Sequence, residues 1–211
     1  MKYFINAGHS NEDSGATSPH GNLRESDIAM IIRDELRKKL SNMKLEVLYI
    51  PDELGLRESI DWVNDWCDSD DLAISIHLNS NENRDVRGIE AYYSENSAIA
   101  EVFARQVAKA SNMTNRGVKH DSETYVGSLG WLRNLKCKSV LVECGYISNG
   151  NDYLLLSYPS TRQKIADGII NSIVEMKIRN ELKGLLVLTI GLLEKVVVLL
   201  VNQLKKNYGN K

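Results

Sequence analysis

The stretch that most constrains the fold is residues 71–80, DLAISIHLNS, where a short apolar run ends abruptly at a histidine. Residues 72–76 have the length and composition of a buried strand. A strand that is buried on both faces has no use for a histidine, so His77 is predicted at the strand's end, where a parallel sheet opens toward its ligand. There His77 is a candidate metal ligand or catalytic base, and the alternative is a hydrogen-bonded structural histidine.

Strand and helix patterns alternate along the rest of the chain. Strands are predicted at residues 2–7, 45–50, 72–77, 87–94 and 139–142, and helices at 25–40, 58–67, 97–111, 152–156 and 160–176. Residues 112–130 are polar and contain three glycines, so they are predicted as a long loop. The alternation predicts an α/β fold with a mostly parallel twisted sheet and helices on both faces.

The overall composition excludes several classes of protein. With 211 residues there is room for one ordinary domain and an appendage. The net charge is −2, and lysines and arginines do not cluster around aromatic residues, so no nucleic-acid partner is expected. The three cysteines, Cys67, Cys137 and Cys144, have no CxxC spacing, which argues against a cysteine zinc site and a disulfide framework.

Three more polar residues occupy positions comparable with that of His77. His9 follows the first strand, Glu143 ends the apolar strand 139–142, and Glu25 stands in the first turn of a helix after a loop. The carboxyl ends of parallel strands share one edge of a sheet, so these side chains are expected to lie near one another. Taken alone, Glu25 is better explained as an acidic residue favoured by the helix dipole.

Two histidines and two glutamates can supply the parts of a zinc hydrolase. Two neutral imidazoles and one carboxylate form a ligand set for a catalytic Zn²⁺ that keeps one position open for water. The metal lowers the pKa of that water and polarises a carbonyl group. A second carboxylate, which does not bind the metal, can take the proton from the water and return it to a leaving amine.

The same residues lie within six segments whose joint occurrence is specific. They are NAGHSNEDSGA (6–16), LRESDIA (23–29), LAISIHLNS (72–80), RGIEAYY (87–93), LGWLRN (129–134) and SVLVECGYISNGND (139–152). In this order, and over about the first 177 residues, the chain resembles the zinc-dependent N-acetylmuramoyl-L-alanine amidases of the amidase_3 family, found among bacterial cell-wall amidases and phage endolysins. Ser10 and Asn11 stand where many members have glycines, and Cys144 replaces a larger apolar residue.

The resemblance implies a role for each of the four residues. His9, Glu25 and His77 correspond to the ligands of Zn²⁺, and Glu143 corresponds to the catalytic carboxylate. It also implies peptidoglycan as the substrate, cut at the amide between the lactyl group of N-acetylmuramic acid and the L-alanine of the stem peptide. Residues that we expect to contact substrate at the edge of the groove are Asn79, Arg87, Glu90 and Arg133.

Two other functional classes compete with the zinc amidase. The first is a cysteine peptidase that uses Cys144 or Cys137 with a histidine. Cys144 follows Glu143 in a strand, so its side chain should point to the opposite face and serve as a small buried hydrophobic group. The second is a wall-binding module without catalysis, and the presence of all four candidate site residues argues against it.

The C-terminal segment differs from the rest of the chain, and we expect a catalytic domain at residues 1–177 and a hydrophobic helical tail at 178–211. Within residues 185–204, steps of four and three form a coiled-coil seam of Leu186, Ile190, Leu193, Val197, Leu200 and Leu204. Self-association or packing on the catalytic domain is the preferred interpretation. Membrane contact comes second, because Glu194 and Lys195 would each cost about 2–3 kcal/mol near the middle of a bilayer. A small wall-binding module comes third.

The N-terminal residues read directly as a strand, without the apolar region of a cleavable secretion signal. We therefore expect synthesis in the cytoplasm and release to the cell wall through a separate pore-former of the holin type. This fits a phage or prophage endolysin. The alternative is a bacterial autolysin of the same chemistry, which would usually carry an export signal.

Overall fold

The computed structural model describes residues 1–10 and 12–208, with side chains described as far as Leu200. The chain forms two compact units, Met1–Ser172 and Ile173–Lys211. The domain boundary expected between residues 177 and 178 lies a few residues beyond this division. The assignment of separate functions to the two parts stays a prediction.

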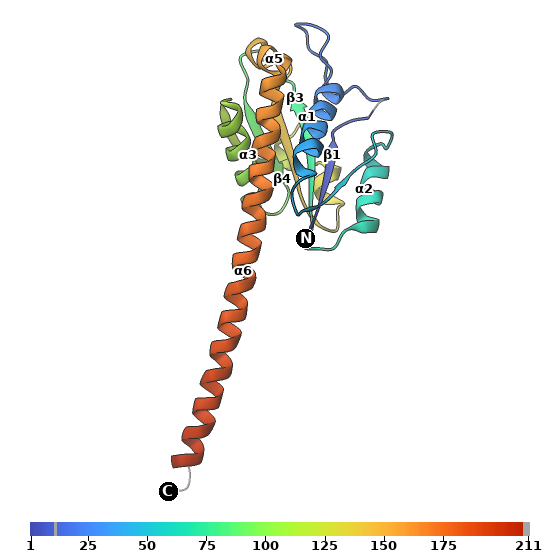
Figure 1. Cartoon of the computed structure of the whole chain (residues 1–211). Coiled ribbons are helices and arrows are strands. Elements are labelled where there is room, and N and C mark those ends of the chain that lie inside the picture. Colours follow the sequence, from blue (N-terminus) through green and yellow to red (C-terminus); the bar gives the residue numbers. More distant parts are fainter. Residues whose placement is uncertain (11, 209–211) are drawn as a thin grey trace. The chain divides into compact units, whose positions relative to one another are not determined.

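The first unit is built on a six-stranded sheet with the order β2-β1-β3-β6-β4-β5. Its strands are β1 (Lys2–Ala7), β2 (Glu46–Tyr49), β3 (Leu72–Asn79), β4 (Ile89–Tyr93), β5 (Asn115–His120) and β6 (Lys138–Tyr146). Strands β1, β3 and β4 of this sheet are labelled in Figure 1. Neighbouring strands run parallel, except that β4 and β6 are antiparallel. The predicted α/β fold with a mostly parallel sheet is therefore confirmed.

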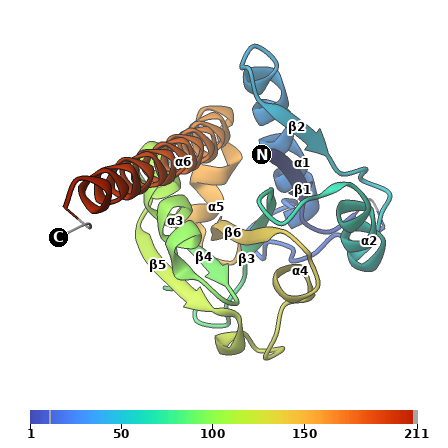
Figure 2. The same ribbon diagram turned by 90° about the horizontal axis from the view of Figure 1, so that it is seen from below.

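Helices cover both faces of this sheet, as predicted. They are α1 (Glu25–Leu40), α2 (Leu56–Trp66), α3 (Ser97–Ser111), α4 (Gly130–Arg133), α5 (Gly150–Ser157) and α6 (Pro159–Tyr208). One face carries α1, α3 and the first part of α6, and the other carries α2 and α4 (Figure 2). The first turn of α1 is acidic and its last turn is basic, which suits the dipole of the helix at both ends.

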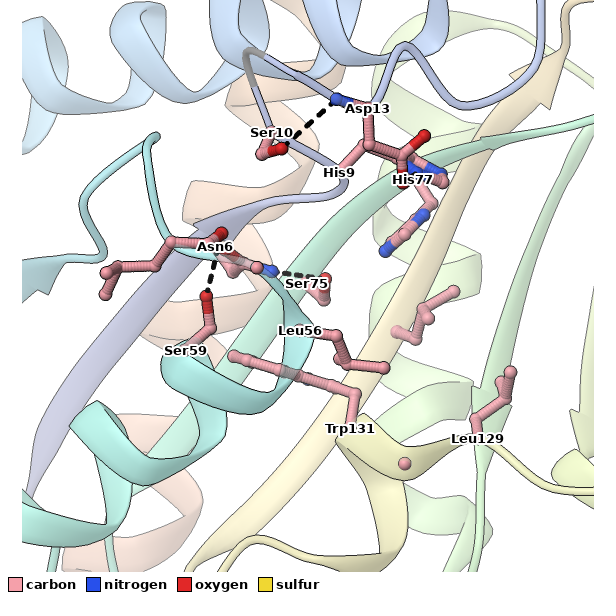
Figure 3. Close-up of a pocket in the computed structure, with 14 residues that line it drawn as sticks. Asn6, His9, Ser10, Asp13, Leu56, Ser59, Ser75, His77, Leu129 and Trp131 are labelled. Atoms are coloured by element: carbon pink, nitrogen blue, oxygen red, sulfur yellow. Dashed lines mark hydrogen bonds and ion pairs between the residues drawn. The ribbon is translucent and has the colours of Figure 1, made fainter.

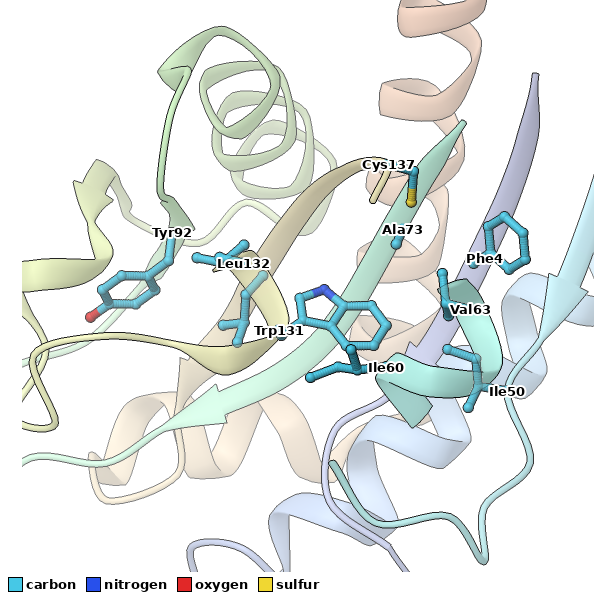
Figure 4. Close-up of a cluster of buried hydrophobic side chains, with 10 residues drawn as sticks. Phe4, Ile50, Ile60, Val63, Ala73, Tyr92, Trp131, Leu132 and Cys137 are labelled. Atoms are coloured by element: carbon cyan, nitrogen blue, oxygen red, sulfur yellow. The ribbon is translucent and has the colours of Figure 1, made fainter. Parts of the chain in front are cut away.

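Alternation along the strands assigns their side chains to the two faces. On the face covered by α2 and α4, one core cluster contains Phe4, Ile50, Ile60, Val63, Ala73, Tyr92, Trp131, Leu132, Cys137 and Leu141 (Figure 4). Successive side chains of a strand point in opposite directions, so Ile5, Ile74 and Val142 face the other layer, and all three are fully buried. His77 lies four residues after Ala73 and therefore belongs to the face of α2 and α4.

Strand β3 is a buried central strand that positions His77 at the edge of the sheet. Its apolar residues Leu72, Ala73, Ile74 and Ile76 are completely buried, whereas His77 is only half-buried. Parallel neighbours β1 and β6 flank β3 on its two sides. The strand predicted from the sequence is present and extends two residues beyond His77, to Asn79.

Residues 112–130 are not one long loop, and that prediction is wrong. They contain β5, a 3₁₀ turn at Asp121–Glu123 and the first residue of α4. The strand escaped prediction because NRGVKH has few residues that favour strands, and because β5 is an edge strand that pairs only with β4. Buried Asp121 then fixes the turn, since it accepts hydrogen bonds from the Leu129 backbone and from Arg133.

At Gly168, α6 lies close to the backbone of α3, and replacement of this glycine tests the packing. A Cβ at Gly168 would lie 2.5 Å from the Cα of Val107 and 2.9 Å from the carbonyl oxygen of Gln106. Helix propensity favours alanine over glycine by about 1 kcal/mol, but overpacking against backbone costs about 1–3 kcal/mol. We expect Gly168→Ala to lower the free energy of unfolding, measured by urea denaturation.

The matched control is Gly184→Ala in the same helix. Nothing lies within 4 Å of the Cβ that this substitution would add. Its free energy of unfolding should therefore stay unchanged or rise by up to about 1 kcal/mol, as propensity alone requires. Equal destabilisation by the two substitutions would contradict the close helix contact as the cause.

The second unit continues α6, which confirms that the hydrophobic tail is helical. Its apolar side chains are exposed both on the predicted seam, with Leu193 at 59%, and beside it, with Leu192 at 68%. Leu204, the last residue of the predicted seam, lies outside the described side chains. Within the part of the chain that the structure describes, no helix has the length and apolarity needed to cross a membrane.

Candidate metal centre and catalytic carboxyl

Two histidines and a glutamate meet at the carboxyl ends of β1 and β3. His9 follows β1, His77 belongs to β3, and Glu25 is the first residue of α1. The Nε2 atom of His9 lies 3.1 Å from Oε2 of Glu25, and Nδ1 of His77 lies 2.9 Å from Oε1 of the same carboxylate. One ligand atom from each residue lies within 4.8 Å of the other two. The structure thus brings together the three residues that were predicted to hold a metal.

Two glycines make room for this cluster. A Cβ at Gly8 would lie 2.4 Å from the ring of His77, and a Cβ at Gly15 would lie 2.5 Å from the ring of His9 and 2.6 Å from Glu25 Oε2. His9 itself has a φ of +66°, a left-handed conformation that costs a non-glycine residue about 1–3 kcal/mol. Backbone strain of this kind is typical of functional sites, where the rest of the fold compensates for it.

Glu25 is fixed by groups from three segments of the chain. Its carboxylate accepts hydrogen bonds from the backbone N–H of Ala16 at 2.9 Å and of Leu78 at 3.1 Å, besides its contacts with the two imidazoles. Burial alone would raise the pKa of Glu25, but the hydrogen bonds with His77 and His9 outweigh it and hold the pKa below its usual value. The carboxylate is therefore ionised and available as a ligand.

Asp13 orients His9, and sequence reasoning missed it. Its Oδ2 atom lies 2.8 Å from Nδ1 of His9, while its Oδ1 accepts a hydrogen bond from the backbone of Gly15. This contact leaves Nε2 of His9 facing Glu25, whose hydrogen bond is the main reason that the pKa of His9 is raised to about 9. The available signal was an aspartate four residues after the histidine, within the same polar loop.

The donor set fits a Zn²⁺ ion. Zinc in proteins favours imidazole nitrogen and carboxylate oxygen, and two histidines with one glutamate leave an open position in a tetrahedral site. Histidines that bind metals almost always use their other nitrogen to contact a carboxylate or a backbone carbonyl, as His9 does with Asp13. The glycines that clear space around both rings agree with a site shaped for an ion.

Glu143 lies in β6, directly opposite His77 across one strand pair and Glu90 across the other. The residue keeps some exposure, but its Oε2 atom is inaccessible and has no hydrogen-bond partner among the described residues. Burial raises the pKa of Glu143 well above its usual value, and the charges of Glu25 and Glu90 raise it further. A buried carboxyl with a free oxygen beside a metal-type cluster is suited to proton transfer.

Glu90 does not lie at the edge of a groove, and the prediction that placed it there is wrong. Its side chain is completely buried, and it binds five neighbours: Asn79, Tyr92, Tyr146, Arg116 and Lys119. Burial would raise the pKa of Glu90, but the contacts with Lys119, Arg116 and Tyr146 lower it. The physical reason for the error is the β4–β6 pairing, which turns Glu90 toward the interior beside Glu143.

The three other predicted substrate contacts are dispersed. Asn79, two residues beyond His77, is half-buried and donates a hydrogen bond to Glu90 at 2.8 Å. Arg87 is exposed, in the segment that leads into β4. Arg133 belongs to α4, where it pairs with Asp121, and it does not line the pocket that contains the histidines. Substrate contact by these residues stays a prediction.

His9 and His77 form one end of a pocket with a volume of about 220 Å³ (Figure 3). Its floor comes from β1, β3 and β6, and its walls come from the beginnings of α2 and α4. The remaining lining residues are Asn6, Ser10, Asp13, Leu54, Gly55, Leu56, Ser59, Ser75, Leu129, Gly130, Trp131 and Leu141. A group of the substrate that occupies this pocket would lie next to His9 and His77.

Sites with two histidines, a glutamate ligand and a separate carboxyl group are typical of hydrolases that cleave amide bonds. Residues 4–175 match the Amidase_3 family, N-acetylmuramoyl-L-alanine amidase, and the chain belongs to this family. It is therefore an enzyme of the N-acetylmuramoyl-L-alanine amidase class, and its substrate is peptidoglycan.

Individual proteins resemble the chain over most of its length. The protein YqiI of Bacillus subtilis is 31% identical over 81% of this chain and 82% of its own length. The endolysin of Bacillus phage SPP1 is 28% identical over 82% of this chain and 65% of its own length. The catalytic domain of CwlV, an N-acetylmuramoyl-L-alanine amidase from Bacillus polymyxa, superposes with a TM-score of 0.73, at 27% identity over 83% of this chain and 97% of that domain.

Proposed function

We propose that the enzyme cleaves the amide between N-acetylmuramic acid and the L-alanine of the stem peptide with a Zn²⁺ ion held by His9, Glu25 and His77. The observation that carries the proposal is the convergence of these three side chains on one point, with ligand atoms within 4.8 Å of one another. Membership of the amidase family supports the choice of bond.

The residues of the site have separate roles in the reaction. When bound, Zn²⁺ supplies Lewis-acid chemistry, polarising the carbonyl and lowering the pKa of water. Glu143 accepts a proton from the attacking water and donates it to the leaving amino group of L-alanine. Asp13 holds the imidazole of His9 in one orientation, and Leu78 and Ala16 hold the carboxylate of Glu25 through their backbone N–H groups.

Product analysis tests the proposed bond. Purified peptidoglycan digested with the zinc-loaded enzyme should gain free amino groups on L-alanine and free lactyl carboxyl groups on N-acetylmuramic acid in equal amounts. No new reducing sugar ends should appear. New amino groups on any other residue of the stem peptide would identify a peptidase and overturn the proposal.

Removal of the Asp13 carboxylate tests the orientation of His9. Outer partners of metal-binding histidines typically contribute about 10–100-fold to metal affinity. We expect Asp13→Ala to weaken zinc binding by a factor in this range, measured by competition with a chelator of known affinity. Asp27→Ala, which removes a half-buried carboxylate of α1 that pairs with Arg24, is the matched control and should bind zinc as the wild type does.

For the biological setting we propose a phage or prophage endolysin, made in the cytoplasm and released to the wall by a pore-former. The similarity to the SPP1 endolysin supports this setting, and the similarity to the bacterial amidase CwlV supports the autolysin alternative. Expression inside a host cell distinguishes them. The endolysin should lyse cells only when a pore-forming protein is expressed with it, whereas an exported autolysin needs no pore-former.

For the tail we propose self-association through the seam that contains Leu186, Leu193 and Leu200. Light scattering should give the full chain a mass of two or more copies, and a chain ending at Lys177 the mass of one. Leu193→Asn on the seam should favour the monomer, while the adjacent Leu192→Asn, which lies off the seam and is equally exposed, should not. A monomeric full-length chain would exclude self-association.

A further inference from the structure

The pocket beside the histidine cluster is suited to one part of the substrate. Pockets for drug-sized ligands have volumes of about 300–1,000 Å³, and this one has about 220 Å³, so it holds a single group of the substrate. Because His9 and His77 form one end of it, a group in the pocket would lie next to the scissile amide. The amide has two such sides, the N-acetylmuramoyl sugar and the peptide that begins with L-alanine.

The charges of the residues that line the pocket indicate which of these two parts of the substrate it binds. Among the described residues that line the pocket there is no lysine or arginine, and the one acidic group, Asp13, lies at the histidine end in contact with His9. A stem peptide carries free carboxylate groups, including the one at its end. The muramoyl sugar is uncharged, because its only carboxyl group is consumed in the scissile amide. Away from the histidine end, the lining is therefore uncharged, which matches the sugar and offers nothing to pair with the peptide's carboxylates.

The chemistry of the walls and floor agrees with this choice. Leu56 and Leu129 supply apolar contacts from the starts of α2 and α4, and the side chains of Asn6, Ser59 and Ser75 supply amide and hydroxyl groups (Figure 3). The Asn6 amide nitrogen donates to the Ser75 hydroxyl at 3.1 Å, which orders these polar groups before substrate binds. Apolar surface next to uncharged hydrogen-bonding groups suits a pyranose ring with hydroxyl and N-acetyl substituents.

We propose that the pocket between the starts of α2 and α4 is the subsite for the N-acetylmuramoyl sugar, with Leu56 and Leu129 determining specificity for it. The proposal rests on the proposed amide cleavage. Leu56 is the residue best suited to a test, because it is 58% exposed and its replacement does not disturb the core.

The experiment compares two substrates that share the scissile bond and the peptide. N-acetylmuramoyl-L-alanyl-D-glutamate carries the sugar, and D-lactoyl-L-alanyl-D-glutamate lacks it. Leu56→Trp fills the pocket, and it should lower kcat/KM for the sugar-bearing substrate about tenfold or more, while kcat/KM for the lactoyl substrate changes less than twofold. Leu154→Trp makes the same change at a leucine of similar exposure in α5 and should leave both values unchanged.

A second pair of substrates excludes the peptide as occupant. The ratio of kcat/KM between N-acetylmuramoyl-L-alanyl-D-glutamate and N-acetylmuramoyl-L-alanine should be the same in Leu56→Trp and wild type. An equal loss on the sugar-bearing and lactoyl substrates, or a change in the peptide-length ratio, would assign the pocket to the peptide and overturn the proposal. Failure of the amide cleavage itself is a separate result, in which wild-type enzyme releases no L-alanine amino groups from peptidoglycan.

Discussion

Replacing Glu143 by glutamine is expected to lower kcat by about 10²–10⁴-fold, the usual contribution of a positioned general acid or base. The amide of glutamine keeps the size of the side chain but can neither accept a proton from water nor return one to the leaving amine. The zinc content, measured by atomic absorption, should equal that of the wild type, because the proposed ligands are His9, Glu25 and His77.

The position of Glu143 in the sheet is the reason to expect a loss of kcat without a loss of zinc or stability. Glu143 stands opposite His77 across the β3–β6 pair, and its buried Oε2 atom has no hydrogen-bond partner among the described residues, so the substitution breaks no hydrogen bond at that atom. The mutation should therefore leave the melting temperature close to that of the wild type. The Oε2 atom of Glu143 is instead available for proton transfer with water and substrate.

The control is Glu82→Gln, which makes the same chemical change at an exposed residue between β3 and β4. It should retain wild-type kcat. Near wild-type turnover in Glu143→Gln would remove the general-base assignment. The alternative of a fold whose role is wall binding would be revived by a different result, in which purified wild-type enzyme releases no product.

The strands that carry the site could be predicted because their apolar runs are short and end in a polar residue. Burial on both faces makes residues 72–76 apolar except for Ser75, and β6 shows the same pattern before Glu143. Since parallel strands end at one edge, two such endings are sufficient to place His77 beside Glu143. Strand β5 lacked any such signal, because an edge strand has no need of a continuous apolar run.

Parts of the site that depend on contacts between distant segments could not be predicted. Glu90 alternates correctly with its neighbours in β4, but only the antiparallel pairing with β6 shows that this side of the strand faces Glu143, beside the cations and tyrosines that contact Glu90. The role of Asp13 depends on the left-handed backbone of His9, which turns the ring toward the loop. Neither feature leaves a periodic pattern in the sequence.

Removal of the metal is expected to have the largest effect, a loss of activity to background. Without the ion, the carboxylate of Glu25 is occupied by hydrogen bonds with His9 and His77, and no group remains to polarise the substrate carbonyl. Dialysis against a chelator should therefore abolish release of L-alanine amino groups from peptidoglycan. Addition of Zn²⁺ in stoichiometric amount should restore it, and Mg²⁺, which prefers oxygen ligands, should not.

Thiol alkylation is the control that separates this mechanism from a cysteine enzyme. Cys144 is fully buried, and burial raises the pKa of its thiol far above the range in which a thiolate forms. Burial likewise raises the pKa of Cys137 to about 12. Both thiols are thus poor nucleophiles near neutral pH, and iodoacetamide should leave the zinc-loaded enzyme active.

His77→Ala provides the genetic counterpart of metal removal. It deletes one of the three proposed ligands from the end of a fully buried strand, so the fold should survive while zinc affinity falls. Activity should be lost and should not return with added Zn²⁺ at concentrations that restore the chelated wild type. Full activity of His77→Ala, or inactivation of the wild type by iodoacetamide but not by the chelator, would show that the reaction proceeds without this metal centre.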